Sequence, residues 1–286
     1  MNIGLLGFGV VGGGVWELAQ ENRALNVKKV LVRREAPPLG KAAVQDVEAI
    51  LRDTDIDTVV EVLGGLHPAY EWICRALAAG KDVVTANKAV ISAYYRELTA
   101  LAHENGAALR CTAAVGGGIP WLVNLQRCRR VDTVTEVGGI MNGTTNFIMD
   151  AMARQGADFP AVLQRAQELG YAEADPSADI DGDDIRRKLT ISANIAFDAL
   201  LREEDIPAFG MVKDDRHRTR ALVTPEGREI GIVNDQAVFS LVGQIQEETH
   251  RFAITYHHQH HTKSAMRSVL DGVPGLGPKR QAELRK

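Results

Sequence analysis

The sequence predicts an α/β protein built around a parallel sheet with helices packed against it. Over residues 1–112, short β-rich runs alternate with helical patterns, as they do in repeated strand–helix–strand units. A glycine-rich turn at residues 7–12 joins the first strand directly to the first helix. The chain has 286 residues, which is more than one small core needs, so we expect a further domain after this one.

Each element of the predicted sheet follows from a local pattern. Residues 1–7 are apolar and β-rich, and residues 58–63 (TVVEVL) show the same character before a pair of glycines. Helices are expected where apolar residues recur at three- and four-residue spacing. We predict strands at 1–7, 27–32, 58–63, 82–85 and 108–112, and helices at 10–20, 44–52, 68–79 and 93–105.

The turn after the first strand has the pattern G-x-G-x-x-G. The first glycine permits a tight turn, the second lets the backbone approach a pyrophosphate, and the third lets helix and strand pack closely. The helix N-terminus supplies N–H groups and the positive end of a dipole. A glycine-rich turn without a ligand is the alternative. We predict a Rossmann-type dinucleotide-binding domain over 1–128, with the cofactor contacted by Gly7, Phe8, Gly9, Val10, Val11 and Gly12.

The residues after the second strand bear on which nucleotide is bound. An acidic residue there would hold the 2′-hydroxyl of NAD, but this chain has Arg33 and Arg34. Two guanidinium groups suit a 2′-phosphate, which favours NADP, although NAD stays possible and the pair could be a solvated loop.

Composition narrows the location and the partners. The chain has no apolar run long enough to span a membrane, and its start lacks the basic lead of a signal peptide. Its three cysteines lack metal-binding spacing, which favours a reducing, cytoplasmic setting. Aromatic residues are only 5% of the chain, so stacking surfaces for nucleic acid are not expected to dominate.

An acid–base pair near residue 185 is the first candidate for catalysis. Asp184 and Lys188 are four residues apart, so on a helix they would share one face. An ammonium near a reacting carbonyl can stabilise a developing alkoxide and then release its proton to it. The alternative is a surface salt bridge beside a solvated acidic loop.

Six segments, together with the glycine turn, resemble homoserine dehydrogenase in order and spacing over residues 1–210. The resemblance implies reduction of aspartate 4-semialdehyde to homoserine with NAD(P)H, in the biosynthesis of threonine, methionine and isoleucine, by a protein that is commonly a homodimer. It also implies an α+β substrate domain over 129–210. The segments are DIDTVVEVLGGLHP (55–68), VVTANKA (83–89), AAVGGGIP (113–120), GGIMNGTTNFIMD (138–150), ELGYAEADPSADIDGDDIRRKL (168–189) and IAFDALLREEDIPAFG (195–210).

The resemblance also implies roles for single residues. Lys88 in TANK matches the lysine between nicotinamide and substrate, and Thr85 of the same segment belongs to the cofactor contacts. Lys188 matches the proton donor. The substrate is expected to be held by Glu173, Asp184, Asp179 and Gly170.

A monovalent-cation site of the family is only partly matched. Val115, Gly117 and Ile119 correspond to residues that offer backbone carbonyls to a sodium ion. Thr112 stands where the family often has a glutamate, so the ion lacks its carboxylate ligand here. This departure makes a bound sodium ion doubtful.

The last part, residues 211–286, resembles the C-terminal region of excinuclease C, the nuclease of nucleotide-excision repair. Residues 273–280 (VPGLGPKR) match the turn of a helix-hairpin-helix, in which backbone N–H groups and basic side chains contact DNA phosphates. His250 matches a catalytic histidine, but the metal-binding aspartates have no counterpart, and Asp214 and Asp215 cannot be assumed to replace them. We therefore expect weak, non-specific DNA contact and no incision.

The junction near residues 210–211 leaves alternatives open. The long stretch that completes the family's substrate domain is not found, so we expect that domain to be truncated and followed by a small α/β tail. The junction is either a genuine fusion or an artefact of gene assembly. The chain is then a working dehydrogenase, a DNA-binding fragment of a repair nuclease or an inactive chimera.

Overall fold

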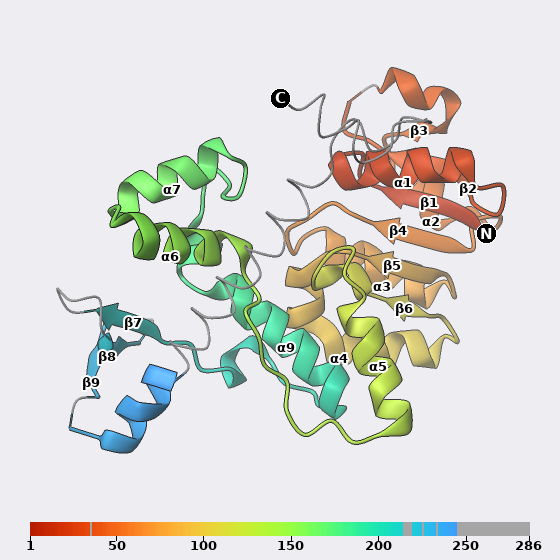
Figure 1. Cartoon of the computed structure of the whole chain (residues 1–286). Coiled ribbons are helices and arrows are strands. Elements are labelled where there is room, and N and C mark those ends of the chain that lie inside the picture. Colours follow the sequence, from red (N-terminus) through yellow and green to blue (C-terminus); the bar gives the residue numbers. More distant parts are fainter. Residues whose placement is uncertain (35, 214–218, 225, 233, 245–286) are drawn as a thin grey trace, which may run out of the picture. The chain divides into compact units, whose positions relative to one another are not determined.

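The computed structural model describes residues 1–34, 36–213, 219–224, 226–232 and 234–244 (Figure 1). The chain divides into two compact units. Unit 1 comprises residues 1–141 and 182–208, and unit 2 comprises residues 142–181 and 209–286.

Unit 1 contains a parallel sheet of six strands in the order β3-β2-β1-β4-β5-β6. The order reverses between β1 and β4, so the loops after these two strands diverge and leave a crevice at the carboxyl edge. The predicted α/β class is confirmed, and each of the five predicted strands overlaps an observed one. The strands are β1 (Asn2–Leu6), β2 (Asn26–Leu31), β3 (Ala43–Val44), β4 (Thr58–Glu61), β5 (Asp82–Thr85) and β6 (Leu109–Arg110).

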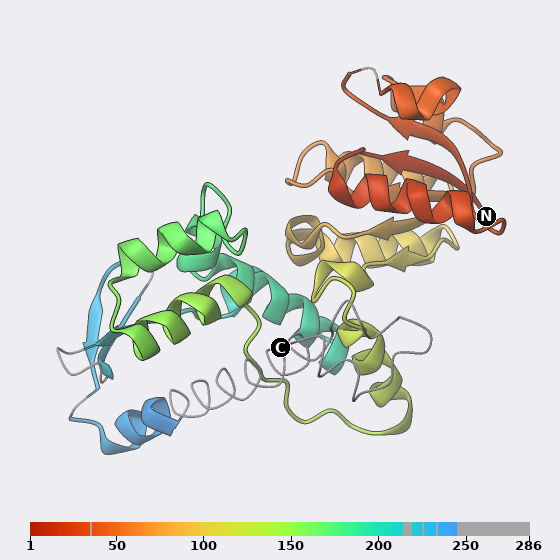
Figure 2. The same cartoon turned by 45° about the horizontal axis from the view of Figure 1, so that its top comes forward.

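Helices pack along the six-stranded sheet of unit 1 (Figure 2). Successive residues of a strand point to opposite faces, so β1 sends Leu5 into one core cluster and Leu6 into another. The cluster of Leu5 includes Ala19 of the first helix, and that of Leu6 includes Ile73 and Leu98 of later helices. The helices are α1 (Val10–Glu21), α2 (Glu48–Leu51), α3 (Ala69–Ala78), α4 (Lys88–Glu104), α5 (Trp121–Val131) and α9 (Asp183–Phe197), with 3-10 turns η1 (Pro37–Ala42), η2 (Thr112–Ala114) and η3 (Glu203–Asp205).

Helix α4 begins five residues before the predicted start at residue 93. Asn87 is its N-cap, and the Asn87 Oδ1 accepts a hydrogen bond of 3.2 Å from the backbone N–H of Val90. The cap extends the helix to Lys88, which becomes its first residue. The predicted helix at 44–52 is also shorter than expected, because β3 takes its first residue and α2 begins only at Glu48.

The compact units divide the chain differently from the predicted domains, since residues 182–208 belong to unit 1. The cause is α9, which packs against α4 and α5. Its residues Ile191, Ile195 and Ala196 are buried in the same cluster as Ile73 and Leu98. The predicted domain 129–210 is therefore not one continuous body.

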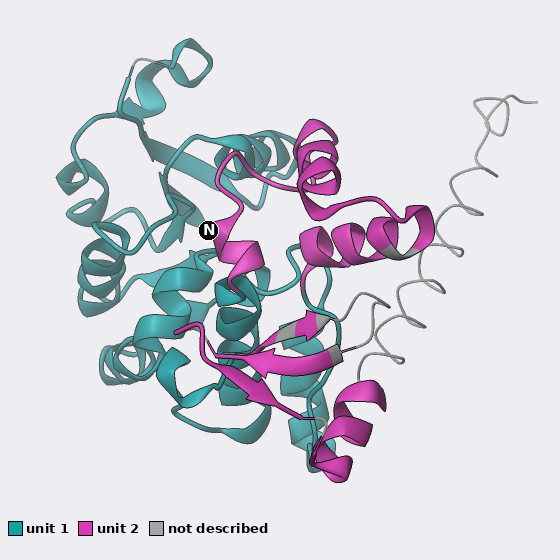
Figure 3. Cartoon of the chain, turned by 90° about the vertical axis from the view of Figure 1, so that its left-hand side faces the viewer, with its two compact units in different colours: residues 1–141, 182–208 teal, residues 142–181, 209–286 magenta. Residues whose placement is uncertain are grey.

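Unit 2, coloured magenta in Figure 3, contains a helical part and a small sheet. The helical part has a core of Ile148, Val162 and three alanines. The sheet is antiparallel in the order β7-β8-β9, and residues 236–244 are helical. The elements are α6 (Gly143–Gln155), α7 (Phe159–Glu168), α8 (Ser177–Ile180), β7 (Gly210–Lys213), β8 (Thr219–Val223) and β9 (Glu229–Gly231).

Among the described residues of both units, no helix combines the length and the apolar character that crossing a bilayer requires.

Candidate active site

The glycine turn after β1 has the geometry that a dinucleotide requires. Gly7 has φ of 106°, a left-handed conformation that a side chain would strain. A Cβ at Gly12 would overlap the carbonyl oxygen of Gly7, so this glycine lets α1 approach the turn. Gly9 is the N-cap of α1, and nothing lies within 4 Å of where its Cβ would stand. The open N-terminus of α1 therefore fits a pyrophosphate.

Three further residues of the turn lie where a ligand could reach them. Val10 and Val11 are the first residues of α1, and their side chains are exposed to solvent. Phe8 is half-buried and packs against the core cluster that contains Leu5. The turn is thus anchored on one side and open on the other.

Arg33 and Arg34 follow β2, next to β1 in the sheet, and both side chains are exposed. Neither forms an ion pair with another residue in the described part of the chain. Two guanidinium groups beside the crevice are therefore free to meet an anion.

The predicted catalytic lysines converge on one carboxylate in unit 1. Lys88 is the first residue of α4, whereas Asp184 and Lys188 lie one turn apart on α9. The Lys88 Nζ donates to Asp184 Oδ1, and the Lys188 Nζ lies 2.6 Å from Asp184 Oδ2. Residues about a hundred positions apart thus form one cluster, and the four-residue spacing of Asp184 and Lys188 does put them on one helix face.

The cluster is partly withdrawn from water. The Asp184 side chain is 5% exposed, that of Lys188 18% and that of Lys88 39%. Lys188 also donates a hydrogen bond of 2.7 Å to the carbonyl oxygen of Met141, which fixes its Nζ from a second direction. With all three groups ionised the cluster carries one net positive charge, and low exposure strengthens its effect on a nearby anion.

A buried network lies under the start of α4, and the sequence interpretation missed it. Glu61, the last residue of β4, is fully buried. Its carboxylate accepts hydrogen bonds from the Thr85 hydroxyl (2.5 Å), the backbone N–H of Leu63 (2.8 Å) and the Asn87 side-chain amide (3.4 Å). The hydroxyl of Thr85, a predicted cofactor contact, is therefore committed to Glu61. The signal that could have found Glu61 is a single acid inside the apolar run TVVEVL.

The other predicted substrate ligands belong to unit 2. Asp179 is half-buried on α8, and its Oδ1 accepts a hydrogen bond of 2.6 Å from the Asn142 amide. Glu173 is exposed in the segment between α7 and α8, and its backbone carbonyl accepts from the Gln167 amide. Gly170 has φ of 76° just after α7. The structure thus leaves the Glu173 carboxylate open to solvent.

The predicted sodium segment offers only neutral oxygens. Thr112 is exposed at the start of η2. The carbonyl of Ile119 already accepts a hydrogen bond of 2.7 Å from the backbone N–H of Trp121. Val115 is buried, whereas Gly117 is exposed with φ of 56°. Without a carboxylate this donor set does not fit a firmly held cation, and no step below depends on one.

The residues on which the repair-nuclease resemblance depends lie outside the described residues. These are His250 and the hairpin segment 273–280. Asp214 and Asp215 also lie outside them.

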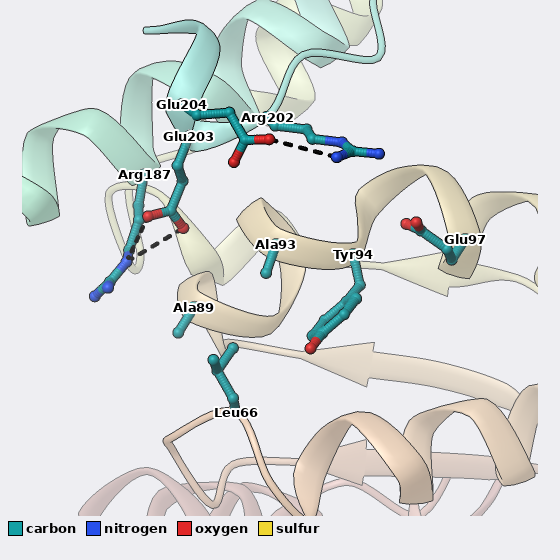
Figure 4. Close-up of a pocket in the computed structure, with 9 residues that line it drawn as sticks. All are labelled: Leu66, Ala89, Ala93, Tyr94, Glu97, Arg187, Arg202, Glu203 and Glu204. Atoms are coloured by element: carbon teal, nitrogen blue, oxygen red, sulfur yellow. Dashed lines mark hydrogen bonds and ion pairs between the residues drawn. The ribbon is translucent and has the colours of Figure 1, made fainter. Parts of the chain in front are cut away.

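A cavity of about 440 Å³ in unit 1 borders the start of α4 (Figure 4). Its charged residues are largely paired with one another: Arg187 with Glu203 at 3.3 Å and Arg202 with Glu204 at 3.4 Å. The remaining lining residues are Leu66, Ala89, Ala93, Tyr94 and Glu97. Because its charges are internally matched, the cavity indicates no particular ligand.

Two family models together match most of the chain. Residues 7–112 match the model described as "Homoserine dehydrogenase, NAD binding domain". Residues 120–269 match the model described as "Homoserine dehydrogenase". The second match alone spans more than half of the chain and continues past residue 210.

Individual relatives agree with this assignment. The homoserine dehydrogenase of Synechocystis sp. is 43% identical over 225 residues, which is 74% of this chain and 52% of that protein. The homoserine dehydrogenase of Bacillus subtilis is 38% identical with the same shares covered. The chain therefore spans about half the length of the curated relatives it matches.

Solved structures give the same result. A homoserine dehydrogenase from Thiobacillus denitrificans superposes with a TM-score of 0.67 at 38% identity, covering 71% of this chain and 50% of that one. A putative homoserine dehydrogenase from Archaeoglobus fulgidus gives a TM-score of 0.61 at 28% identity, covering 83% and 86%. With its glycine turn, its strand order and the extent of these matches, the chain belongs to the homoserine dehydrogenase family.

Proposed function

We propose that the chain reduces aspartate 4-semialdehyde to homoserine with NADPH, a step that serves threonine, methionine and isoleucine biosynthesis. The observation that carries this proposal is the convergence of Lys88 and Lys188 on the buried carboxylate of Asp184. A cluster with one excess positive charge suits a reaction in which a neutral aldehyde acquires negative charge on oxygen.

The cofactor, when bound, supplies a hydride to the aldehyde carbon. The turn of residues 7–12 and the N-terminus of α1 are suited to hold its pyrophosphate. Lys88 begins the helix that follows β5, at the same carboxyl edge of the sheet, which suits a role beside the nicotinamide. In this proposal the hydroxyl of Thr85 supports the loop from beneath, because it is bonded to Glu61.

Lys188 is the proton donor in this proposal. Its Nζ is oriented by Asp184 and by the Met141 carbonyl, so its remaining N–H group has a defined direction. As negative charge develops on the substrate oxygen, Lys188 stabilises it and then transfers a proton to it. Lys88 adds a second positive charge to the same cluster.

The substrate's α-ammonium needs carboxylate partners. We assign this role to Asp184, Glu173 and Asp179, with Gly170 at the edge of the binding site, as the family resemblance implies. The exposed carboxylate of Glu173 supports the assignment, because no partner side chain needs to be displaced from it in the described part of the chain.

The decisive test replaces Lys188 with methionine, which keeps the length of the side chain and removes its proton. We expect kcat to fall by roughly 10²- to 10⁴-fold in an assay of NADPH oxidation with aspartate 4-semialdehyde. Lys41→Met is the matched control, because Lys41 is an exposed lysine of unit 1 remote in sequence from the cluster. No turnover by folded wild-type protein, or full turnover by Lys188→Met, would refute the proposal.

We also propose NADP as the preferred cofactor. The exposed guanidinium groups of Arg33 and Arg34 support it, since they suit a 2′-phosphate. Replacing both arginines by serine should raise KM for NADPH about tenfold or more and leave KM for NADH nearly unchanged. Equal losses with the two cofactors would show that the pair only supports the fold.

Assembly and location are further parts of the proposal. A homodimer is expected from the family resemblance, and a cytoplasmic setting is expected because Cys74, Cys111 and Cys128 are all free thiols. A sodium ion is not part of the proposed mechanism.

DNA binding is not a function that we propose here, since the family match continues to residue 269. The likeness of residues 211–286 to a repair nuclease stays a prediction, and so do the fusion boundary and the truncation. Salt-sensitive DNA binding that is lost on removing residues 270–286 would support it.

A further inference from the structure

We infer that Glu61 is a positioning residue for the reaction, which fixes the start of α4 and thereby the place of the Lys88 ammonium. This inference rests on the proposed function. It assigns to a buried acid a role that neither the glycine turn nor the lysine cluster supplies.

The first argument is the cost of burying the Glu61 carboxylate. Its side chain is fully buried at the end of β4, where the two preceding residues are the apolar Val59 and Val60. Burying a carboxylate is strongly unfavourable unless hydrogen bonds replace its water. An apolar residue here would extend the core, so an acid at this position needs a specific use.

The second argument is where its hydrogen bonds lead. Glu61 accepts from the backbone N–H of Leu63 in its own loop and from the hydroxyl of Thr85 at the end of β5. The Thr85 oxygen in turn accepts from the backbone N–H of Asn87 at 2.9 Å. Since Thr85 has one hydroxyl proton, which it gives to Glu61, the order of donors and acceptors is fixed.

The third argument is that this network ends at the catalytic helix. Asn87 donates to the carbonyl of Gly65 at 2.7 Å, and its Oδ1 caps α4 at Val90. It thus ties the loop after β4 to the loop after β5, directly before Lys88. The next residue, Lys88, reaches Asp184 on another helix. A shift of the α4 start would move the Lys88 Nζ relative to Asp184 and Lys188.

A purely structural link between β4 and β5 makes a different prediction. If Glu61 only held the two strands together, its loss would lower stability, and the folded enzyme would keep its kcat. If Glu61 positions Lys88, kcat falls in folded protein, and the loss depends on Lys88 being present.

Glu61→Gln is the informative variant because it keeps the volume of the side chain. A glutamine has one acceptor oxygen, so it cannot accept from both Leu63 and Thr85, and its NH₂ group faces a donor. Glu97→Gln is the matched control, since Glu97 is an exposed glutamate on α4 in the same unit. Lys88→Ala and the double variant Glu61→Gln/Lys88→Ala complete a cycle.

The experiment uses the full chain with NADPH and aspartate 4-semialdehyde. We expect Glu61→Gln to lower kcat about 10- to 100-fold, as a small misplacement of a catalytic group does, with KM changed far less. The double variant should be no slower than Lys88→Ala. Unchanged kcat in folded Glu61→Gln, or losses that multiply in the double variant, would overturn the inference.

Hydrogen exchange separates this inference from the proposed function. Glu61→Gln should speed amide exchange at residues 62–66 and 86–91 together, whereas Glu97→Gln should not. If wild-type protein shows no turnover, the proposed function fails, and the exchange measurement still tests the positioning role. Unchanged exchange at residues 86–91 in Glu61→Gln would then overturn it.

Discussion

Unit 1 and unit 2 carry different parts of the proposed site on very different foundations. Unit 1 packs its helices around a six-stranded sheet, and its clusters include fully buried Leu5, Leu6, Ile73 and Leu98. The helical cluster of unit 2 has five buried residues, three of them alanines. Unit 2 also leaves several large apolar side chains exposed, among them Met149, Phe159, Leu169, Tyr171, Phe209, Phe239 and Leu241.

The polar groups of the two units differ in the same direction. Asp184 in unit 1 is buried between two ammonium groups, so its position is set by packing and by charge. Asp179 in unit 2 is half-buried beside a neutral amide, and Glu173 is exposed. The difference teaches that the proton-donating groups are held rigidly, whereas the residues assigned to the substrate's amino end have freedom to adjust.

The largest expected effect comes from the two cores. Ile73→Ala in α3 should cost about 2–5 kcal/mol in the opening free energy of unit 1, because the side chain is fully buried. Ile148→Ala in α6 should increase amide exchange in unit 2 and leave the most protected amides of β1, β4 and α9 unchanged. Native-state hydrogen exchange of both variants measures this.

This comparison breaks under one outcome. If Ile148→Ala lowers protection equally in both units, then the two units open together, and unit 2 has no separate freedom.

A matched pair of aspartates gives the next largest effect. Asp184→Asn should lower stability by about 2 kcal/mol, because it removes the charge from between Lys88 and Lys188. Asp179→Asn keeps an acceptor for the Asn142 amide and should cost about 0.5 kcal/mol or less. Urea unfolding compares the two, and equal costs would contradict the idea that charge organises unit 1 alone.

Alkaline pH should affect unit 1 selectively, because all three cysteines lie in it. Burial raises the pKa of the Cys111 thiol from 9.0 to about 11. Between these values the unfolded chain releases a proton that the folded chain retains, so stability falls as pH rises. The loss is on the order of 2 kcal/mol by about pH 11.

Two variants isolate this term. Cys111→Ala should show a weaker fall in stability above about pH 9 than the wild type, because the buried thiol is gone. The same change at the exposed Cys128 should leave the wild-type slope intact. Parallel pH curves for wild type and Cys111→Ala would mean that the buried thiol does not titrate with unfolding.

The sequence by itself determined the local features of this protein. The glycine turn, the alternation of strands and helices, and the four-residue spacing of Asp184 and Lys188 each depend on neighbouring residues. The structure accordingly has the parallel sheet, the left-handed Gly7 and the shared helix face at the expected positions. The family segments also indicated Lys88 as a partner in the same chemistry.

Tertiary structure alone decided which distant residues meet. The return of α9 to unit 1 depends on the packing of Ile191 and Ile195 against α4 and α5, which no local pattern records. The same holds for Glu61, whose partners Thr85 and Asn87 follow a neighbouring strand. The physical reason is that burial and hydrogen-bond satisfaction are properties of the folded surroundings, so a single acid in an apolar run gains its meaning only when its donors are in place.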